Sequence, residues 1–432
     1  MPTFVLRAMG TALLVAHLAH PVLAQSREAA PDTLRLEAVL AELHTSPQLR
    51  AARLGASALA TEAVVSDAWP DPSISLAVQP FPILTARGSQ RLLFRFEQML
   101  PWPGTLSRRR NVADGNAAVA GAEVQVLLAD LSLQVQQAYI RLARVQAIEA
   151  LIRGFQERLR TFAEAAAIRY EVGRGPQAAI LRLQLESNRL ETHLLALDAE
   201  RHLARSALAR LIDRPGLDAD AVFVEPVALP AFDSALVSFA RRERPERNVL
   251  DARAQRQEAE IELAKRAFYP DIGASFTYFG IYADEALPMG DGRDALAIGL
   301  SVKIPLDRAS RQSRLEAARM RAAQVEAQLE AFDAEIETQI EALRFAAAQE
   351  RDQLALYRTR LHPQAQLTIE STLATYTTGQ ADFLTLLDAE RARFELQIGE
   401  AEAEARYATI AAQLARALGL PSLYALSTTT YE

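Results

Sequence analysis

The chain has 432 residues, a net charge of −7 and no cysteine, so it can form neither a disulfide nor a thiolate metal site. Its basic residues are dispersed among acidic ones, which is not the pattern of a nucleic-acid-binding protein. The six histidines form no ligand cluster beyond the first 24 residues, and no nucleophilic triad, phosphate loop or HExxH pattern is present. We therefore expect neither an enzyme nor a cofactor.

The first 24 residues have the pattern of a secretory signal peptide. Arg7 precedes an apolar run at 8–19, and small residues end at Ala24 as a cleavage site would. The run is shorter than the roughly 20 residues that span a bilayer. No later segment holds 18 consecutive apolar residues, so a membrane-spanning role for this exported chain would require a closed barrel of strands.

The remaining chain repeats itself at a separation of about 200 residues. Trp69-Pro70-Asp71 matches Tyr269-Pro270-Asp271, and the Tyr-x-x-Gly sequence ending at Gly173 matches the one ending at Gly379. We interpret 25–213 as the first repeat and 241–420 as the second. Residues 214–240 are then a linker, and 421–432 are a tail.

Each repeat begins with an expected helix, at 34–66 or 246–267, which ends before a proline. Two strands follow in each repeat, at about 72–79 and 91–100 and at about 271–281 and 294–304. In the strands, apolar residues alternate with small or polar ones. The residues that we expect to face lipid are Leu92, Phe94, Phe96, Leu296, Ile298, Leu300 and Val302. A sheet lying on a soluble core would show the same alternation, but barrel crossings need about 9–11 residues, and the chain offers no separate core for these strands to cover.

A long helical hairpin completes each repeat, at about 104–212 and 307–418. Apolar or alanine positions recur at alternating spacings of three and four residues, which predicts coiled-coil seams. A helix over 104–171 would be roughly 100 Å long, which is too long for a compact domain. Each hairpin turns at a glycine, Gly173 or Gly379, the usual residue after a helix end.

Four strands cannot close a barrel, and an unpaired backbone group in lipid costs several kcal/mol. Several copies must then close the ring if the strands cross a membrane. Two copies would give eight strands, whose interior is filled by side chains, whereas three would give twelve and leave a lumen. We therefore expect a homotrimer.

This order of elements, duplicated, resembles the TolC family of outer membrane efflux proteins over nearly the whole mature chain. The strand exits Leu100-Pro101-Trp102-Pro103-Gly104 and Ile304-Pro305-Leu306, together with the two Tyr-x-x-Gly turns, carry the resemblance. It implies a mainly α protein with a small β part: a trimeric, 12-stranded transmembrane β-barrel in the bacterial outer membrane, continued by a long periplasmic α-helical coiled-coil barrel.

The resemblance also implies a function and its partners. The chain would be the outer membrane channel of a tripartite efflux pump, passing small solutes (metal ions or drugs) from an inner-membrane pump and a periplasmic adaptor to the exterior. The pump would be of the resistance-nodulation-division class, and the Pro-Trp-Pro-Gly exit is similar to that of channels paired with heavy-metal pumps. Alternatives are the outer membrane component of a type I protein secretion system and, in another class, a periplasmic adaptor or coiled-coil scaffold.

Two groups of site residues follow from the resemblance by position. The hairpin tips would contact the adaptor, although their glycines also serve simply as helix ends; they comprise Val172, Gly173, Arg174, Thr378, Gly379 and Gln380. Asp388 matches an acidic ring that gates the periplasmic mouth, and Asp382 is the second candidate. Thr385 stands where better-known channels are acidic, and a solvated charge on a helix face is the alternative for Asp388.

Overall fold

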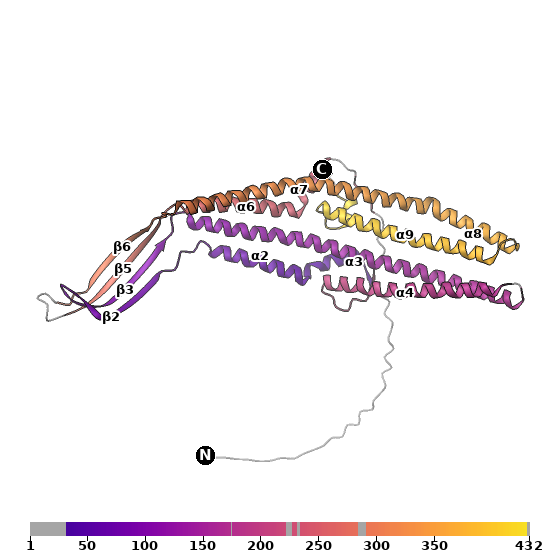
Figure 1. Ribbon diagram of the computed structural model, residues 1–432, viewed down its shortest axis with the longest axis horizontal. Helices are drawn as coiled ribbons and strands as arrows, with labels where there is room; N and C mark the ends of the chain where they lie inside the picture. Colours follow the sequence, from indigo (N-terminus) through magenta and orange to yellow (C-terminus); the bar gives the residue numbers. More distant parts are fainter. Residues whose placement is uncertain (1–31, 174, 222–226, 231–233, 284–290, 430–432) are drawn as a thin grey trace, which may run out of the picture.

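The computed structural model describes residues 32–173, 175–221, 227–230, 234–283 and 291–429. It shows an elongated subunit with a small sheet at one end and long helices over the rest (Figure 1). The prediction of a mainly helical protein with a small β part is confirmed. The expected signal peptide, residues 1–24, lies outside the described residues.

Four antiparallel strands form the sheet in the order β2-β3-β5-β6. They are β2 (Ser73–Thr85), β3 (Gly88–Leu100), β5 (Asp271–Tyr282) and β6 (Ala295–Lys303). The central pair, β3 and β5, joins the first repeat to the second. The edge strands β2 and β6 each have one hydrogen-bonding side without a strand partner in this subunit.

The pairing register places rows of apolar side chains from all four strands on one face. Leu76 is opposite Phe94, Phe94 is opposite Tyr278, and Tyr278 is opposite Leu296. Since directly paired residues point to the same side of a sheet, this row crosses the whole sheet. The next row joins residues 74, 96, 276 and 298 in the same way. All seven residues expected to face lipid therefore share one face, and Ile298 and Leu300 are 86% and 80% exposed.

The helices extend away from the four-stranded sheet and also pack side by side in layers. Next to the sheet, neighbouring helices lie in the order α2 (Pro47–Val65), α3 (Thr105–Glu171), α6 (Pro245–Arg266) and α7 (Arg308–Leu356). Farther away, α3 lies between α4 (Gln177–Leu211) and α9 (Phe383–Ala417), and α8 (His362–Thr377) packs on α9 (Figure 1). The sheet and both helical layers are thus four elements wide.

Helix α3 has 67 residues, which corresponds to about 100 Å at about 1.5 Å per residue. Among the described helices, only α3 contains a window of 18 residues apolar enough to cross a membrane, with a mean hydropathy of 1.3. Helix α3 packs against α2, α4, α6 and α9, but only 22% of this window is buried within the subunit.

The expected helix over 34–66 is wrong as a single element. The structure has β1 (Asp32–Leu34), α1 (Leu36–Glu42), a 3₁₀ turn η1 (Leu43–Thr45) and then α2. Ser46 breaks the helix with an extended ψ of 131° because it precedes Pro47, whose ring disfavours helical geometry in the preceding residue. Pro47 then begins α2, where a missing N–H costs nothing.

The expected linker and tail also contain regular structure. β4 (Ala219–Ala221) pairs in parallel with β1, α5 (Ser234–Glu243) extends past the predicted linker end, and a 3₁₀ helix η3 (Leu423–Ser427) lies in the tail. Together β1, α1, β4, α5 and η3 form a middle cover over the helices, and their apolar side chains join the largest hydrophobic core.

Polar side chains of α3 attach the middle cover. The hydroxyl of Tyr139 donates to the Leu34 carbonyl at 2.8 Å. The side-chain oxygen of Gln136 accepts from the Leu423 N–H at 2.8 Å, and both Gln136 and Tyr139 are buried. Chain segments almost three hundred residues apart in sequence therefore meet on one side of α3.

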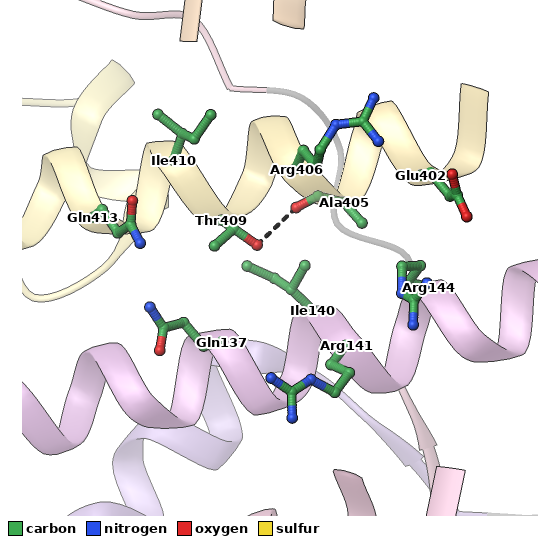
Figure 2. Close-up of a pocket in the computed structure, with 10 residues that line it drawn as sticks. All are labelled: Gln137, Ile140, Arg141, Arg144, Glu402, Ala405, Arg406, Thr409, Ile410 and Gln413. Carbon is green, nitrogen blue, oxygen red and sulfur yellow. Dashed lines mark hydrogen bonds between the residues drawn. The ribbon is translucent and has the colours of Figure 1, made fainter. Parts of the chain in front are cut away.

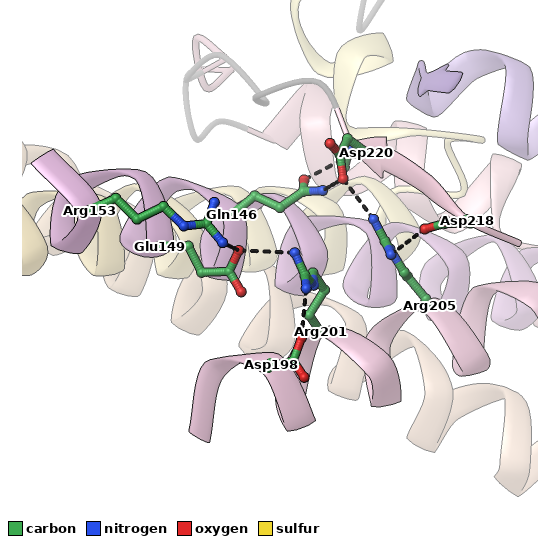
Figure 3. A network of polar contacts seen from close by, with 9 residues as sticks. Gln146, Glu149, Arg153, Asp198, Arg201, Arg205, Asp218 and Asp220 are labelled. Atoms are coloured by element: carbon green, nitrogen blue, oxygen red, sulfur yellow. Dashed lines mark hydrogen bonds and ion pairs between the residues drawn. The ribbon is translucent and has the colours of Figure 1, made fainter. Parts of the chain in front are cut away.

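An ion-pair network joins the first hairpin to β4 (Figure 3). Glu149 of α3 is 3% exposed and accepts from Arg201 of α4 at 3.2 Å. One turn along α4, Arg205 binds Asp220 at 2.8 Å. Gln146 also donates to Asp220 and accepts from the Ala221 N–H at 3.0 Å. Because a buried carboxylate costs several kcal/mol unless paired, this network fixes α3, α4 and β4 relative to one another.

The second hairpin differs from the first in having an interrupted leg. A π-helix, η2 (Tyr357–Leu361), separates α7 from α8, whereas α3 runs without interruption. Pro363 lies two residues after the π-helix. Because proline has no N–H, it cannot donate the regular helical hydrogen bond at that point, and the preceding turn widens. Across the interruption, Arg358 binds Glu400 at 2.8 Å and His362 lies 2.7 Å from the same carboxylate.

Candidate functional site: hairpin tips and tunnel wall

The two hairpins turn on glycines with left-handed backbone geometry. Gly173 has a φ of 71° and Gly379 a φ of 77°, and a Cβ at either would meet no atom within 4 Å. The glycines are therefore needed for conformation and not for space. Val172 is 62% exposed, and Thr378, Gly379 and Gln380 are exposed beside it in the second tip. Arg174, also expected at the tip, lies outside the described residues.

The tips of the two hairpins pack against each other. The guanidinium of Arg169, at the end of α3, lies 4.7 Å from the ring centroid of Tyr376, at the end of α8. Tyr376 in turn meets the edge of Phe383 with 6.0 Å between centroids. A cavity of about 270 Å³ lies between the two turns, lined by residues such as Pro176 and Asp382. The two turns, as far as they are described, thus lie side by side at one end of the subunit.

The candidate gate residues occupy one exposed side of α9. Asp382 is the N-cap residue of α9 and Asp388 lies six positions on; both are exposed, as is Thr385 between them. The intervening Phe383, Leu386 and Leu387 are buried, so the helix has opposite polar and apolar sides here. The structure therefore places both aspartates on the exposed side of α9. The hydroxyl of Thr385 lies between them in the sequence, at the position where the resemblance would lead us to expect a second acidic residue.

A buried ion pair close to the gate residues was missed at the sequence level. Glu390 of α9 is 7% exposed and accepts from Arg393 at 2.7 Å, while Arg158 of α3 lies 3.7 Å away. Burial, and then the charge of Arg393, hold the pKa of Arg158 below its usual value. The rings of Phe155 and Phe394 stack alongside, 4.4 Å apart. The sequence signal for this ion pair was the carboxylate of Glu390, which lies among the apolar positions of a helix seam.

A groove of about 650 Å³ lies between the middle of α3 and the C-terminal half of α9 (Figure 2). Three of its lining residues are arginines. Arg144 is paired with Glu200, and Arg406 with Glu350 at 2.9 Å. The groove is lined by Gln137, Ile140, Arg141, Arg144, Glu402, Ala405, Arg406, Thr409, Ile410 and Gln413. No sequence pattern indicated this groove, because its two walls come from different repeats.

Within the described part of the chain, no group of three or more histidine, aspartate or glutamate side chains is placed to hold a metal ion. The residues brought together at the tips and in the grooves form surfaces and ion pairs.

Comparisons with known proteins give one family and one fold. Residues 236–420, which include the whole second repeat, match the sequence profile of the family described as outer membrane efflux protein. A comparison with curated protein sequences finds no significant match. Among solved structures, CusC is similar with a TM-score of 0.74 at 18% identity, covering 89% of this chain and 92% of CusC.

Two further structures show the same fold. VceC of Vibrio cholerae, an outer membrane protein, gives a TM-score of 0.70 at 20% identity and covers 89% of this chain and 96% of its own. The open state of the MtrE outer membrane channel of Neisseria gonorrhoeae gives 0.71 at 18% identity, with 92% of this chain and 91% of MtrE covered. The likeness therefore extends over both repeats.

Proposed function

The chain belongs to the outer membrane efflux protein family, and from this premise we propose that it is the trimeric outer membrane channel of a tripartite efflux pump. It resides in the bacterial outer membrane with its helices in the periplasm, and it acts as a conduit and not as an enzyme. In the proposal, an inner-membrane pump of the resistance-nodulation-division class and a periplasmic adaptor deliver small solutes, metal ions or drugs, to its helical end.

The observation that carries the proposal is that the subunit has two open borders along its whole length. One border consists of β2, α2 and α4, and the other of β6, α7 and α8. In lipid, the unpaired backbone groups of β2 and β6 would each cost several kcal/mol. Pairing β2 of one subunit with β6 of the next removes this cost around a closed ring.

The helical parts of the same borders expose apolar side chains. On α4, Leu195 and Leu203 are 70% and 66% exposed, and on the other border Phe345 and Leu367 are 66% and 64% exposed. Side chains of this kind at coiled-coil spacing are normally buried against a neighbouring helix. A head-to-tail ring would cover both sets at once, and three copies give the twelve strands that leave a lumen.

The membrane boundary in this proposal lies where the sheet meets the helices. Trp102 and Tyr269 stack there with 5.3 Å between ring centroids, and Arg266 lies 5.6 Å from the Tyr269 centroid. Aromatic rings with nearby cations are typical of the level of lipid head groups. The apolar face of the sheet would contact hydrocarbon, and the exposed tip residues at the opposite end would contact the adaptor.

The proposal is tested by purifying the protein in detergent, measuring its mass by native mass spectrometry and recording conductance in planar bilayers. We expect a trimer that forms water-filled channels, and we expect Leu195→Glu with Leu203→Glu to reduce trimer yield. Co-expression with candidate pumps and adaptors in an efflux-deficient strain then identifies the exported class. A water-soluble monomer that never enters detergent or vesicles would overturn the proposal, and export of a protein but not of small solutes would favour type I secretion.

A further inference from the structure

The groove between α3 and α9 lies on the side of these helices that faces away from the middle cover. Tyr139 of α3 donates to the Leu34 carbonyl of the cover, and Tyr407 of α9 donates to the carbonyl of Val227, which lies in the chain between the cover elements β4 and α5. The groove residues Gln137 and Arg141 are each two positions from Tyr139, and Ala405 and Thr409 are each two positions from Tyr407. Two positions are about half a turn at about 3.6 residues per turn, so the groove and the cover are on opposite sides.

This placement assigns the groove to the inside of the tunnel, a step that rests on the proposed function. In a ring of three subunits, the middle cover has to lie outside, because three copies of its five elements on the axis would fill the lumen. The opposite side of α3 and α9 then faces the lumen. Each trimer would carry three such grooves at one level, near the middle of α3.

The charges of the groove favour an anion. Arg141 is exposed, and among the described residues no carboxylate lies within the 4.0 Å of an ion pair with it, whereas Arg144 and Arg406 are already paired with acids outside the lining. One lining residue, Glu402, is acidic. The amides of Gln137 and Gln413 add further hydrogen-bond donors. A ligand anion would therefore meet one uncommitted guanidinium and two neutral donors, together with the single carboxylate of Glu402.

Part of the remaining lining is apolar, so the groove favours a ligand that also has an apolar part. Ile140, Ala405 and Ile410 lie in the walls between the polar residues (Figure 2). At about 650 Å³ the groove has the size of sites that hold small organic molecules. An inorganic anion would use the arginine alone, whereas an anion with an apolar body would also contact the half-buried Ala405 and Ile410.

We propose that this groove is a binding site for small amphiphilic anions, such as organic sulfonates, carboxylates or phosphates, on their way through the tunnel. The guanidinium of Arg141 binds the head group through charge-assisted hydrogen bonds, and Ala405 and Ile410, which are half-buried, contact the apolar body. The tunnel is then selective at two levels, with uncommitted cations near the middle of α3 and the exposed acids Asp382 and Asp388 near the tips.

The test uses the full-length protein in planar bilayers, with naphthalene-2-sulfonate added on the side of the helices. We expect it to block the wild-type current, and we expect Arg141→Gln to weaken the block about tenfold, the effect of losing one hydrogen bond to a charged group. Arg141→Lys should retain part of the block because the charge remains. Arg210→Gln, which removes an exposed arginine at the end of α4, is the matched control. Naphthalene-2-sulfonate should block this variant as strongly as it blocks wild type.

Two results would overturn the inference: a block by naphthalene-2-sulfonate that Arg141→Gln leaves unchanged, or an equal block by the cation 2-naphthylmethylammonium. Calorimetric binding of naphthalene-2-sulfonate to the purified protein is the second measurement, because the groove is complete within one subunit. Arg141-dependent binding without conducting channels would refute the proposed function and keep the site. Channels that conduct but bind no sulfonate would refute the site and keep the function.

Discussion

Gly115 of α3 lies directly against Arg256 of α6, at the point where the helix of the first repeat crosses to the second. A Cβ on Gly115 would be 3.0 Å from the Arg256 Cβ and 3.1 Å from its Cα, which is closer than packed carbon atoms normally approach. Glycine is therefore required here by a neighbouring backbone and not by its own conformation.

From this contact we expect Gly115→Ala to destabilise the protein by about 1–3 kcal/mol, since the two helices must separate. Gly121 lies farther along the same helix, and a Cβ there would have no atom within 4 Å, so Gly121→Ala should stabilise by up to about 1 kcal/mol through helix propensity. Thermal unfolding followed by circular dichroism measures both. Equal effects of the two substitutions would contradict the close packing of α3 and α6.

A charge on the apolar face of the sheet should block membrane assembly. We expect Leu300→Arg to cost about 2–4 kcal/mol because it places a guanidinium in hydrocarbon. Ala297→Arg is the matched control: it lies on the same strand, is exposed and points to the other face. The yield of heat-resistant trimer in outer membrane fractions compares them. If both variants assemble equally well, the apolar face does not contact lipid.

Asp388 should make the channel prefer cations. Three copies of this exposed carboxylate near the axis would attract cations and repel anions, so Asp388→Ala should shift the reversal potential in a salt gradient towards that of a non-selective pore. Asp382→Ala should have a smaller effect if the cap position lies farther from the axis. Glu37→Ala, on α1 of the middle cover, serves as the control. An unchanged reversal potential in Asp388→Ala would remove this residue from the gate.

Acid should weaken the junction between α9 and α6. Burial raises the pKa of the Glu246 carboxyl, but the hydrogen bond and charge of Arg416, 2.5 Å away, outweigh burial and hold that pKa below its usual value. A carboxyl with a depressed pKa contributes stability above its unfolded-state pKa of about 4.3, and this contribution is lost as the pH falls through the folded-state value.

We therefore expect Glu246→Gln to lower stability at pH 7 by about 1–3 kcal/mol and to lose less than wild type between about pH 5 and pH 3. Glu258→Gln, an exposed position on the same helix, should leave the profile unchanged. Unfolding by denaturant at a series of pH values supplies the measurement. Parallel profiles for wild type and Glu246→Gln would show that another group governs acid sensitivity.

Local periodicity was sufficient for the main elements of the fold. The alternation at 296–302 and the seams over 104–171 predicted β6 and α3 nearly to the residue. The first strand was predicted to end at 79, but β2 continues to Thr85. Pro80 and Pro82 disguised the continuation, and they are tolerated because β2 is an edge strand, where one row of N–H groups has no partner within the subunit.

Features that depend on distant segments were not predictable in this way. β1 and β4 have three residues each, which is too short for any period to show, and they exist because they pair with each other on top of α3. The π-helix at Tyr357–Leu361 lies inside the hairpin predicted over about 307–418, where Pro363 was the available sign of an interruption. The groove that contains Arg141 combines one wall from each repeat and has no local signature.

The two open borders of the subunit are not alike, and this difference has a genetic consequence. A head-to-tail ring uses each border of every member once, so a subunit damaged on α4 alone can still receive a neighbour at its α7 and α8 side. Such a subunit would join the growing assembly and leave it unable to close. Border mutations should therefore be dominant over a normal copy of the gene, whereas mutations that merely unfold the chain should be recessive.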